Sequence, residues 1–193
     1  MKKELKIYVF RHGQTEYNRD SKFTGSVDAK ITKTGLEDAK IVAIRLKDKK
    51  FPVAFHTSLS RSKDTLKEVL KFHPECKKLI CDDRMVERSY GALNSQTHLQ
   101  VVRKHGFKKY DEWHRSWNVR PPKGECFADV EKRVKIFIKD LKEFMKKEKV
   151  NVAISAHGNS IRLFRKIMEG LSIKKTCELF IPYDKVFEYK IKV

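Results

Sequence analysis

The apolar positions of the chain follow two different periods, and each period predicts a kind of secondary structure. Short, nearly continuous apolar runs have the length of strands buried in a parallel sheet. They span residues 6–10, 53–58 and 150–155. Longer segments repeat apolar residues at helical spacing; these are residues 36–50, 60–72, 127–147 and 160–170. The segment 186–193 alternates apolar and polar residues, which predicts a strand at or near the edge of the sheet.

The order of these elements predicts the fold class. Strands and helices alternate in the first half of the chain and again in the last third. This order favours a three-layer α/β/α sandwich, in which a mostly parallel sheet carries helices on both faces. The length of 193 residues suits a single domain over residues 1–193. Residues 84–124 are less regular and rich in aromatic and basic side chains, so we expect an insertion or lid over a site.

Composition excludes several classes of protein. Hydrophobic residues make up 40% and charged residues 36% of the chain, which fits a globular protein with a core. No apolar run approaches the roughly 20 residues of a transmembrane helix, and the N-terminal run is too short for a signal peptide, so we expect a cytoplasmic protein with no membrane partner. The four cysteines are too few and too spread for a disulfide framework. Cys76 and Cys81 with His73 give only a weak metal pattern, and we expect no metal.

The formal net charge of +19 predicts that the protein attracts anions. A phosphorylated metabolite, a nucleic acid or an acidic membrane would each be attracted by this positive charge. No recognised nucleic-acid-binding motif accompanies the lysines, so we expect no specific nucleic acid and place most lysines on solvated surfaces. A basic nucleic-acid-binding protein that has kept an inactive catalytic fold is the hypothesis from a different class.

Polar side chains with catalytic potential follow three of the predicted strands. Arg11, His12 and Gly13 follow the first strand, Arg61 lies in the first turn of the helix after the second, and His157 follows the third. In parallel sheets the ligand lies beyond the carboxyl ends of the strands, where these residues would meet. A neutral imidazole can attack phosphorus, and guanidinium groups match phosphate oxygens. This convergence predicts phosphoryl transfer through a phosphohistidine.

Glu87 offers a carboxylate from the irregular segment. Opposite a phosphoryl acceptor it would give or take the proton of the leaving oxygen, and otherwise it would form an ion pair with Arg88 or Arg84. If His12 lies among the predicted cations, like charge lowers its pKa and keeps its imidazole neutral at pH 7. Activity is then expected to persist through neutral pH.

Together these elements resemble the histidine phosphatase superfamily, and most closely its cofactor-dependent phosphoglycerate mutases. The similar segments cover nearly the whole chain in the order of that family. They are RHGQTEYN, FTG at 23–25, ITKTG at 31–35, TSLSRSKDT, ERSYGAL, WNVRPP, GECFADVEKRV and AHGNSIR. The combination of ERxYG, VRPP and AHGNSxR is specific.

The resemblance implies a role for each matching residue. His12 would be the phosphorylated nucleophile and Glu87 the proton donor and acceptor. The phosphoryl group would be held by Arg11, Asn18, Arg61 and His157. Substrate contacts would come from Thr24, Gly25, Gly158 and Asn159, and its carboxylate or second phosphate would be bound by Arg88, Tyr90 and Arg115. The implied reaction interconverts 3-phosphoglycerate and 2-phosphoglycerate in glycolysis and gluconeogenesis. It is primed by 2,3-bisphosphoglycerate and needs no metal. Assembly into a homo-oligomer stays an open alternative.

This chain departs from the family pattern around the substrate site. His98 stands where the family usually has Lys, and His114-Arg115 stands where it has an Arg-Arg pair. The long segment before the GES-like motif and the tail after the last strand are missing. Histidines near pH 7 are largely neutral, and a shorter segment leaves a wetter pocket, which favours water as acceptor. The alternative is therefore a histidine-type phosphatase for a small phosphomonoester such as phosphoserine or a sugar phosphate.

Overall fold

The computed structural model describes residues 4–192, so residues 1–3 and Val193 of the last predicted strand lie outside the described residues. The strands are β1 (Glu4–Arg11), β2 (Val53–His56), β3 (Lys78–Cys81), β4 (Val152–Ala156) and β5 (Val186–Lys192). The helices are α1 (Glu16–Arg19), α2 (Lys33–Leu46), α3 (Ser60–Leu70), α4 (His98–His105), α5 (Phe107–Arg115), α6 (Phe127–Glu148), α7 (Gly158–Glu169) and α8 (Ile173–Glu178). Two short 3₁₀ turns are η1 (Asp83–Met85) and η2 (Gly91–Leu93).

The five strands form one sheet in the order β3-β2-β4-β1-β5. Four strands run parallel, and β5 runs antiparallel to β1 at the edge, as the alternating pattern predicted. The register pairs Arg11 with Ala156. This pairing sets the residues after β1 beside those after β4, where the first and last predicted catalytic segments begin.

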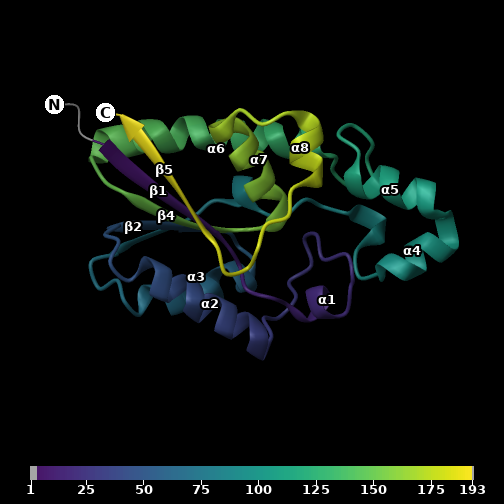
Figure 1. Cartoon of the computed structure of the whole chain (residues 1–193), viewed down its shortest axis with the longest axis horizontal. Coiled ribbons are helices and arrows are strands. Elements are labelled where there is room, and N and C mark those ends of the chain that lie inside the picture. The colour runs from purple at the N-terminus through teal and green to yellow at the C-terminus, as the bar shows by residue number, and fades with distance from the viewer. Residues whose placement is uncertain (1–3, 193) are drawn as a thin grey trace.

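Helices cover both faces of the sheet, which confirms the predicted three-layer α/β/α class (Figure 1). Ile7 and Val9 of β1 pack toward α6 and α7, whereas Tyr8 and Phe10 pack toward α2 and α3. All four side chains are almost fully buried. A strand covered on both faces needs apolar residues at successive positions, which explains the continuous apolar run seen in the sequence.

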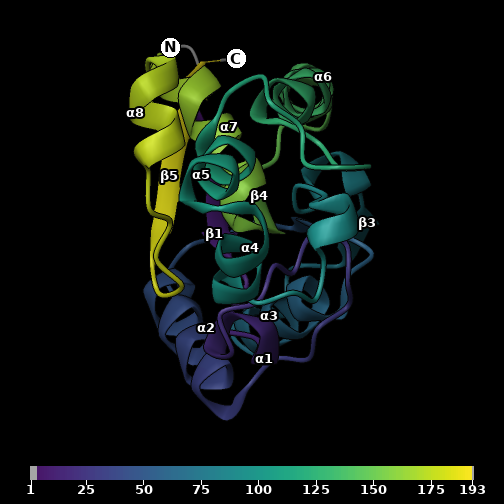
Figure 2. The same cartoon turned by 90° about the vertical axis from the view of Figure 1, so that its right-hand side faces the viewer.

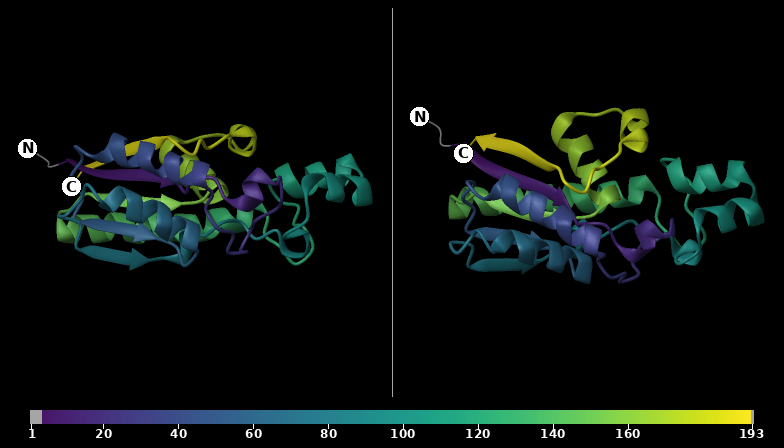
Figure 3. Two further views of the ribbon diagram at one scale, coloured as in Figure 1. Left: turned by 90° about the horizontal axis from the view of Figure 1, so that it is seen from below. Right: turned by 60° about the horizontal axis from the view of Figure 1, so that its bottom comes forward.

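The segment between β3 and α6 lies beyond the carboxyl ends of the parallel strands. Its helices α4 and α5 project past the sheet (Figures 1 and 3) and lie in front of it when the molecule is turned (Figure 2). They are held by a small aromatic and aliphatic cluster made of Phe23, Tyr90, Leu93, Val101 and Trp113. The segment lies where the insertion was expected. Its action as a lid stays a prediction, as does the assignment of one domain to residues 1–193.

Several elements differ from the sequence-based expectation. The strand β3 and the helices α1, α4, α5 and α8 were not predicted. Helix α2 begins at Lys33, three residues earlier than expected, because Thr32 caps it by accepting a hydrogen bond from Gly35 N–H at 3.0 Å. None of the helices within residues 4–192 combines the length and the apolar character needed to cross a bilayer.

The loop after β1 is locked against α2 and α3. A Cβ atom on Gly13 would lie 2.0 Å from the carbonyl oxygen of Gly35, so only glycine permits this close approach. The Gly13 N–H donates to Thr65 Oγ1 at 3.0 Å, and the Thr65 hydroxyl donates to the Arg61 carbonyl at 2.8 Å. Thr65 therefore ties the His12 loop to the helix that carries Arg61.

We expect Thr65→Val to lower the free energy of unfolding by about 1–3 kcal/mol, because a buried N–H loses its acceptor without a change in side-chain shape. Urea denaturation measures the effect, and Thr65→Ser, which keeps the hydroxyl, is the matched control. A valine variant as stable as the wild type would show that this hydrogen bond contributes nothing.

Candidate active site

Two buried imidazoles face each other at the carboxyl ends of β1 and β4. The ring centroids of His12 and His157 lie 4.9 Å apart, and the side chains are 2% and 0% exposed. His12 Nδ1 lies 2.8 Å from the Gly13 carbonyl oxygen, which can only accept. The neutral ring therefore carries its proton on Nδ1, and Nε2 keeps the lone pair that a nucleophile needs.

His157 is held in place through its ring nitrogen Nε2 and its backbone. Its Nε2 lies 2.8 Å from the Thr57 hydroxyl, while its buried Nδ1 has no hydrogen-bond partner among residues 4–192. The residue is the N-cap of α7, and its N–H donates to Ser160 Oγ at 3.3 Å. Ser160, in the first turn of the helix, thus takes part in capping the start of α7.

Arg11 lies along the first turn of α7. Its guanidinium stacks 4.0 Å from the centre of the Tyr183 ring and donates from Nη1 to the Ile181 carbonyl at 2.8 Å. A Cβ on Gly158 would lie 3.4 Å from Arg11 Cζ, at van der Waals distance, so the guanidinium packs against the helix start.

Arg61 is fully buried and bridges the loop 25–27. It donates to the carbonyl oxygens of Val27 at 2.7 Å and Gly25 at 2.9 Å. Within the described chain, Arg61 Nε, Arg11 Nε and His157 Nδ1 are buried without a partner. Buried polar groups are normally satisfied, and an anion beside His12 would satisfy the Nε–H groups of Arg11 and Arg61, as well as His157 Nδ1 in the tautomer that carries the proton there. The structure thus brings together Arg11, His12, Arg61 and His157, the four residues expected to meet beyond the ends of three strands.

The pKa of His12 is well below its ordinary value, mainly because of burial and further because of Arg61 and Arg11. Burial likewise lowers the pKa of His157. The direction predicted for His12 from its cationic neighbours was right, but desolvation contributes more than like charge. Burial also lowers the pKa of Arg61 to about 10, which leaves its guanidinium charged at neutral pH.

Glu87 presents its carboxylate to the same pocket. The side chain is 8% exposed, and Oε1 accepts the backbone N–H groups of Arg88 at 2.8 Å and Asn159 at 3.1 Å. The alternative of an ion pair with Arg84 or Arg88 is not what the structure has: Arg84 pairs with Asp82. Two backbone donors therefore orient Glu87 while Oε2 remains available.

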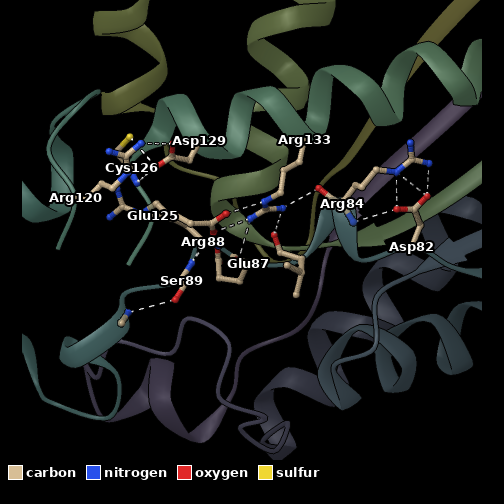
Figure 4. A network of polar contacts seen from close by, with 12 residues as sticks. Asp82, Arg84, Glu87, Arg88, Ser89, Arg120, Glu125, Cys126, Asp129 and Arg133 are labelled. Atoms are coloured by element: carbon tan, nitrogen blue, oxygen red, sulfur yellow. Dashed lines mark hydrogen bonds and ion pairs between the residues drawn. The ribbon is translucent and has the colours of Figure 1, made fainter. Parts of the chain in front are cut away.

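Arg133 of α6 fixes the backbone of the Glu87 segment from behind (Figure 4). Its guanidinium donates to the carbonyl oxygens of Arg84 at 2.7 Å, Val86 at 2.8 Å and Glu87 at 3.3 Å. It also pairs with Glu125 at 3.1 Å. Sequence reasoning gave Arg133 no role, although it lies within the GECFADVEKRV motif.

Arg11 and Glu87 open onto a pocket with a volume of about 270 Å³, whose lining residues do not include His12, Arg61 or His157. The predicted residues that line it are Arg11, Asn18, Thr24, Gly25, Glu87, Tyr90, His98, His114, Arg115, Gly158 and Asn159. The lining residues that sequence reasoning missed are Lys22, Phe23, Arg162, Phe180, Ile181 and Tyr183. Arg162 is the last residue of the AHGNSIR motif, so this motif could have identified it, whereas the loop 179–185 carries no motif.

Arg88 is the predicted substrate-binding residue that does not line this pocket. Its side chain is fully buried, and Nη2 donates to the carbonyl oxygens of Trp113 at 3.1 Å and His114 at 3.2 Å. The guanidinium also lies 4.4 Å from the centre of the Tyr90 ring. Arg88 thus supports the pocket wall from behind, where α5 ends.

His98 and His114 line the outer wall and share one phenol. The Tyr110 hydroxyl lies 3.2 Å from His98 Nδ1 and 3.0 Å from His114 Nδ1. Burial, with Arg115 adding to it, lowers both pKa values, that of His114 to about 2. Both rings are therefore uncharged at neutral pH.

The chemistry of the donors fits a phosphorylated ligand. Among residues 4–192 no group of three or more His, Cys, Asp or Glu side chains is placed to share a metal ion. In the weak pattern seen in the sequence, His73 Nδ1 contacts Glu75 at 3.0 Å, and Cys81 is exposed. Around His12, by contrast, the unpaired Nε–H groups of Arg11 and Arg61 are donors suited to phosphate oxygens.

Comparison with known proteins gives both a sequence and a fold relationship. The profile of the histidine phosphatase superfamily (branch 1) matches residues 7–191. A 2,3-bisphosphoglycerate-dependent phosphoglycerate mutase of Cytophaga hutchinsonii is 33% identical over 97% of this chain and 89% of its own. The fold is shared with a phosphoglycerate mutase of Bacillus anthracis (TM-score 0.83, 23% identity, 99% and 89% covered) and the alpha-ribazole phosphatase of Shigella flexneri (0.82, 21%, 95% and 89%).

The depressed pKa values of His12 and His157 predict that stability falls with acid. Below about pH 6.5 the unfolded chain binds protons that the folded chain excludes, so each histidine removes up to about 1.4 kcal/mol per pH unit from the free energy of unfolding. Urea denaturation at pH 7.5 and 5.5 measures this slope. His157→Gln should make the slope shallower, whereas His105→Gln, at an exposed position, should leave it as it is. A slope that is the same in all three proteins contradicts the assignment.

Proposed function

This chain belongs to the histidine phosphatase superfamily (branch 1), and on that basis we propose that it is a phosphoglycerate mutase that forms a phosphohistidine on His12. The supporting observation is the set of buried nitrogens without a partner on Arg11, Arg61 and His157 beside the neutral imidazole of His12. In this proposal the enzyme interconverts 3-phosphoglycerate and 2-phosphoglycerate.

The proposed reaction has two mirror-image halves. His12 Nε2 forms a bond to phosphorus as the ester P–O bond breaks, and Glu87 gives its proton to the leaving oxygen. Glu87 then takes the proton of the acceptor hydroxyl, whose oxygen attacks phosphorus as the P–N bond breaks. Arg11, Arg61 and His157 hold the equatorial oxygens, where transition-state charge develops. A bisphosphorylated primer, when bound, would supply the first phosphoryl group, and the same unpaired donors fit it.

The size and charge of the pocket support a small phosphorylated acid. A volume of about 270 Å³ lies just below the usual range of roughly 300–1,000 Å³ for ligand sites, which suits a ligand of a few carbons. Beyond Arg11, the lining contains Lys22, Arg115 and Arg162, while Glu87 is the one carboxylate among the lining residues described. This excess of cations favours a second anionic group on the substrate.

One observation favours a second candidate, a phosphatase for a hydroxylated phosphomonoester such as a sugar phosphate. Tyr110 has one hydroxyl proton, yet it contacts Nδ1 of both His98 and His114. At least one ring must therefore donate from Nδ1, and its neutral Nε2 is a hydrogen-bond acceptor. A substrate hydroxyl can donate to that nitrogen, whereas a second phosphate cannot.

The test supplies 3-phosphoglycerate with and without 2,3-bisphosphoglycerate and measures 2-phosphoglycerate and free phosphate together. We expect 2-phosphoglycerate to be the main product and its formation to depend on the bisphosphate. His12→Ala should lose both products, because no other nucleophile is proposed. Phosphate released without 2-phosphoglycerate would reject the mutase in favour of the phosphatase, and an active His12→Ala variant would reject both.

A further inference from the structure

Ion pairing divides the arginines of this protein into two sets. Six of them pair with a carboxylate: Arg19, Arg45, Arg84, Arg120, Arg133 and Arg165. The others have no carboxylate partner within residues 4–192; apart from the exposed Arg103, they lie in or behind the pocket, namely Arg11, Arg61, Arg88, Arg115 and Arg162. Guanidinium groups removed from water without a counter-charge destabilise the protein, so the buried members of this set are poised for anionic ligands.

For four members of this set, a contact or a position beside the proposed phosphoryl group explains the role of the arginine. Arg11 and Arg61 face the proposed phosphoryl position. Arg88 is buried behind the wall and donates to two backbone carbonyls. Arg115 is exposed at the rim and donates to the Cys177 carbonyl at 3.3 Å. Arg162 is the remaining member.

Arg162 lines the pocket with part of its guanidinium unsatisfied. Its Nε is buried without a hydrogen-bond partner, while Nη1 donates to Asn159 Oδ1 at 3.2 Å. Burial lowers the pKa of Arg162 to about 10, so the charge persists at neutral pH. The contact with Asn159 holds the side chain in place without neutralising it.

The position of Arg162 on α7 sets its distance from the reaction centre. Gly158, which packs against Arg11, lies four residues earlier, and four residues of helix rise by about 6 Å. Asn159 lies between them and donates its backbone N–H to Glu87. Gly158 and Arg162 therefore lie on the same face of α7, so an anion on Arg162 and a phosphoryl group on Arg11 would lie on the same side of this helix.

We propose that Arg162 is a specificity-determining residue that binds the carboxylate of the substrate, at the opposite end from the reacting phosphate. The assignment rests on the proposed function, in which the substrate is a small phosphorylated acid. The outer wall of the pocket supports the same assignment of Arg162, because His98 and His114 are uncharged and supply no cation there. Arg162 supplies a fixed charge that those two positions lack.

The test compares Arg162→Met with the wild type on two esters that differ in one group, 3-phosphoglycerate and glycerol 3-phosphate, which has no carboxylate. Turnover is counted as the 2-phosphate isomer of each ester, 2-phosphoglycerate or glycerol 2-phosphate, plus free phosphate, so it is measured whether the enzyme is a mutase or a phosphatase. Arg165→Met is the matched control, because Arg165 lies one turn further along α7 and pairs with Glu169 away from the pocket. Arg162→Lys tests rescue by a charge without the planar fork.

Arg162→Met should raise KM for 3-phosphoglycerate by about 10- to 100-fold with a smaller change in kcat, as expected for the loss of a charge-assisted hydrogen bond. Its turnover of glycerol 3-phosphate should match that of the wild type, Arg162→Lys should recover part of the loss, and Arg165→Met should behave as wild type on both esters. Equal losses on both esters, or no loss on 3-phosphoglycerate, would overturn the proposal, as would a wild-type enzyme that does not prefer the carboxylated ester. Absence of 2-phosphoglycerate alone would reject the mutase and leave the Arg162 comparison intact.

Discussion

The structure depends on one constraint: polar nitrogen atoms are kept buried and unpaired where the parallel strands end. Leaving such groups without partners costs free energy, so the surrounding fold must hold them in place. Backbone carbonyls accept from Nη1 of Arg11 and from both Nη atoms of Arg61, and the Thr57 hydroxyl contacts Nε2 of His157. Each side chain is thereby fixed while its buried Nε or Nδ1 atom stays without a partner. The residual need for an acceptor is what makes this edge of the sheet a site for an anion.

The same burial determines the protonation of His12, the proposed nucleophile. Desolvation keeps His12 neutral, and the Gly13 carbonyl fixes its proton on Nδ1, so the lone pair lies on Nε2. Arg133 reaches from α6 to hold the Glu87 segment, which places a carboxylate opposite a group of cations. At a longer range the net charge of +19 attracts anions such as phosphorylated compounds to the protein. Local burial and overall charge thus act on the same ligand in different ways.

The sequence predicts the central strands and the meeting of Arg11, His12, Arg61 and His157, because both follow from local patterns. Strands buried on two faces are continuously apolar, and parallel strands end at one edge. The exposed four-residue strand β3 has no such pattern, and α4 and α5 are held by a distant aromatic cluster. The position of Arg88 behind the wall depends on tertiary contacts between segments far apart in the chain. No local pattern encodes those contacts.

The most direct measurement of the central claim is the position of a covalently bound phosphate. Rapid quenching of the enzyme with a ³²P-labelled phosphoglycerate, followed by peptide mapping, should find an alkali-stable, acid-labile label on the peptide that contains His12. The label should appear and disappear at rates fast enough to account for turnover. A label on another residue, or steady turnover with no phosphoenzyme at any time, would contradict the account.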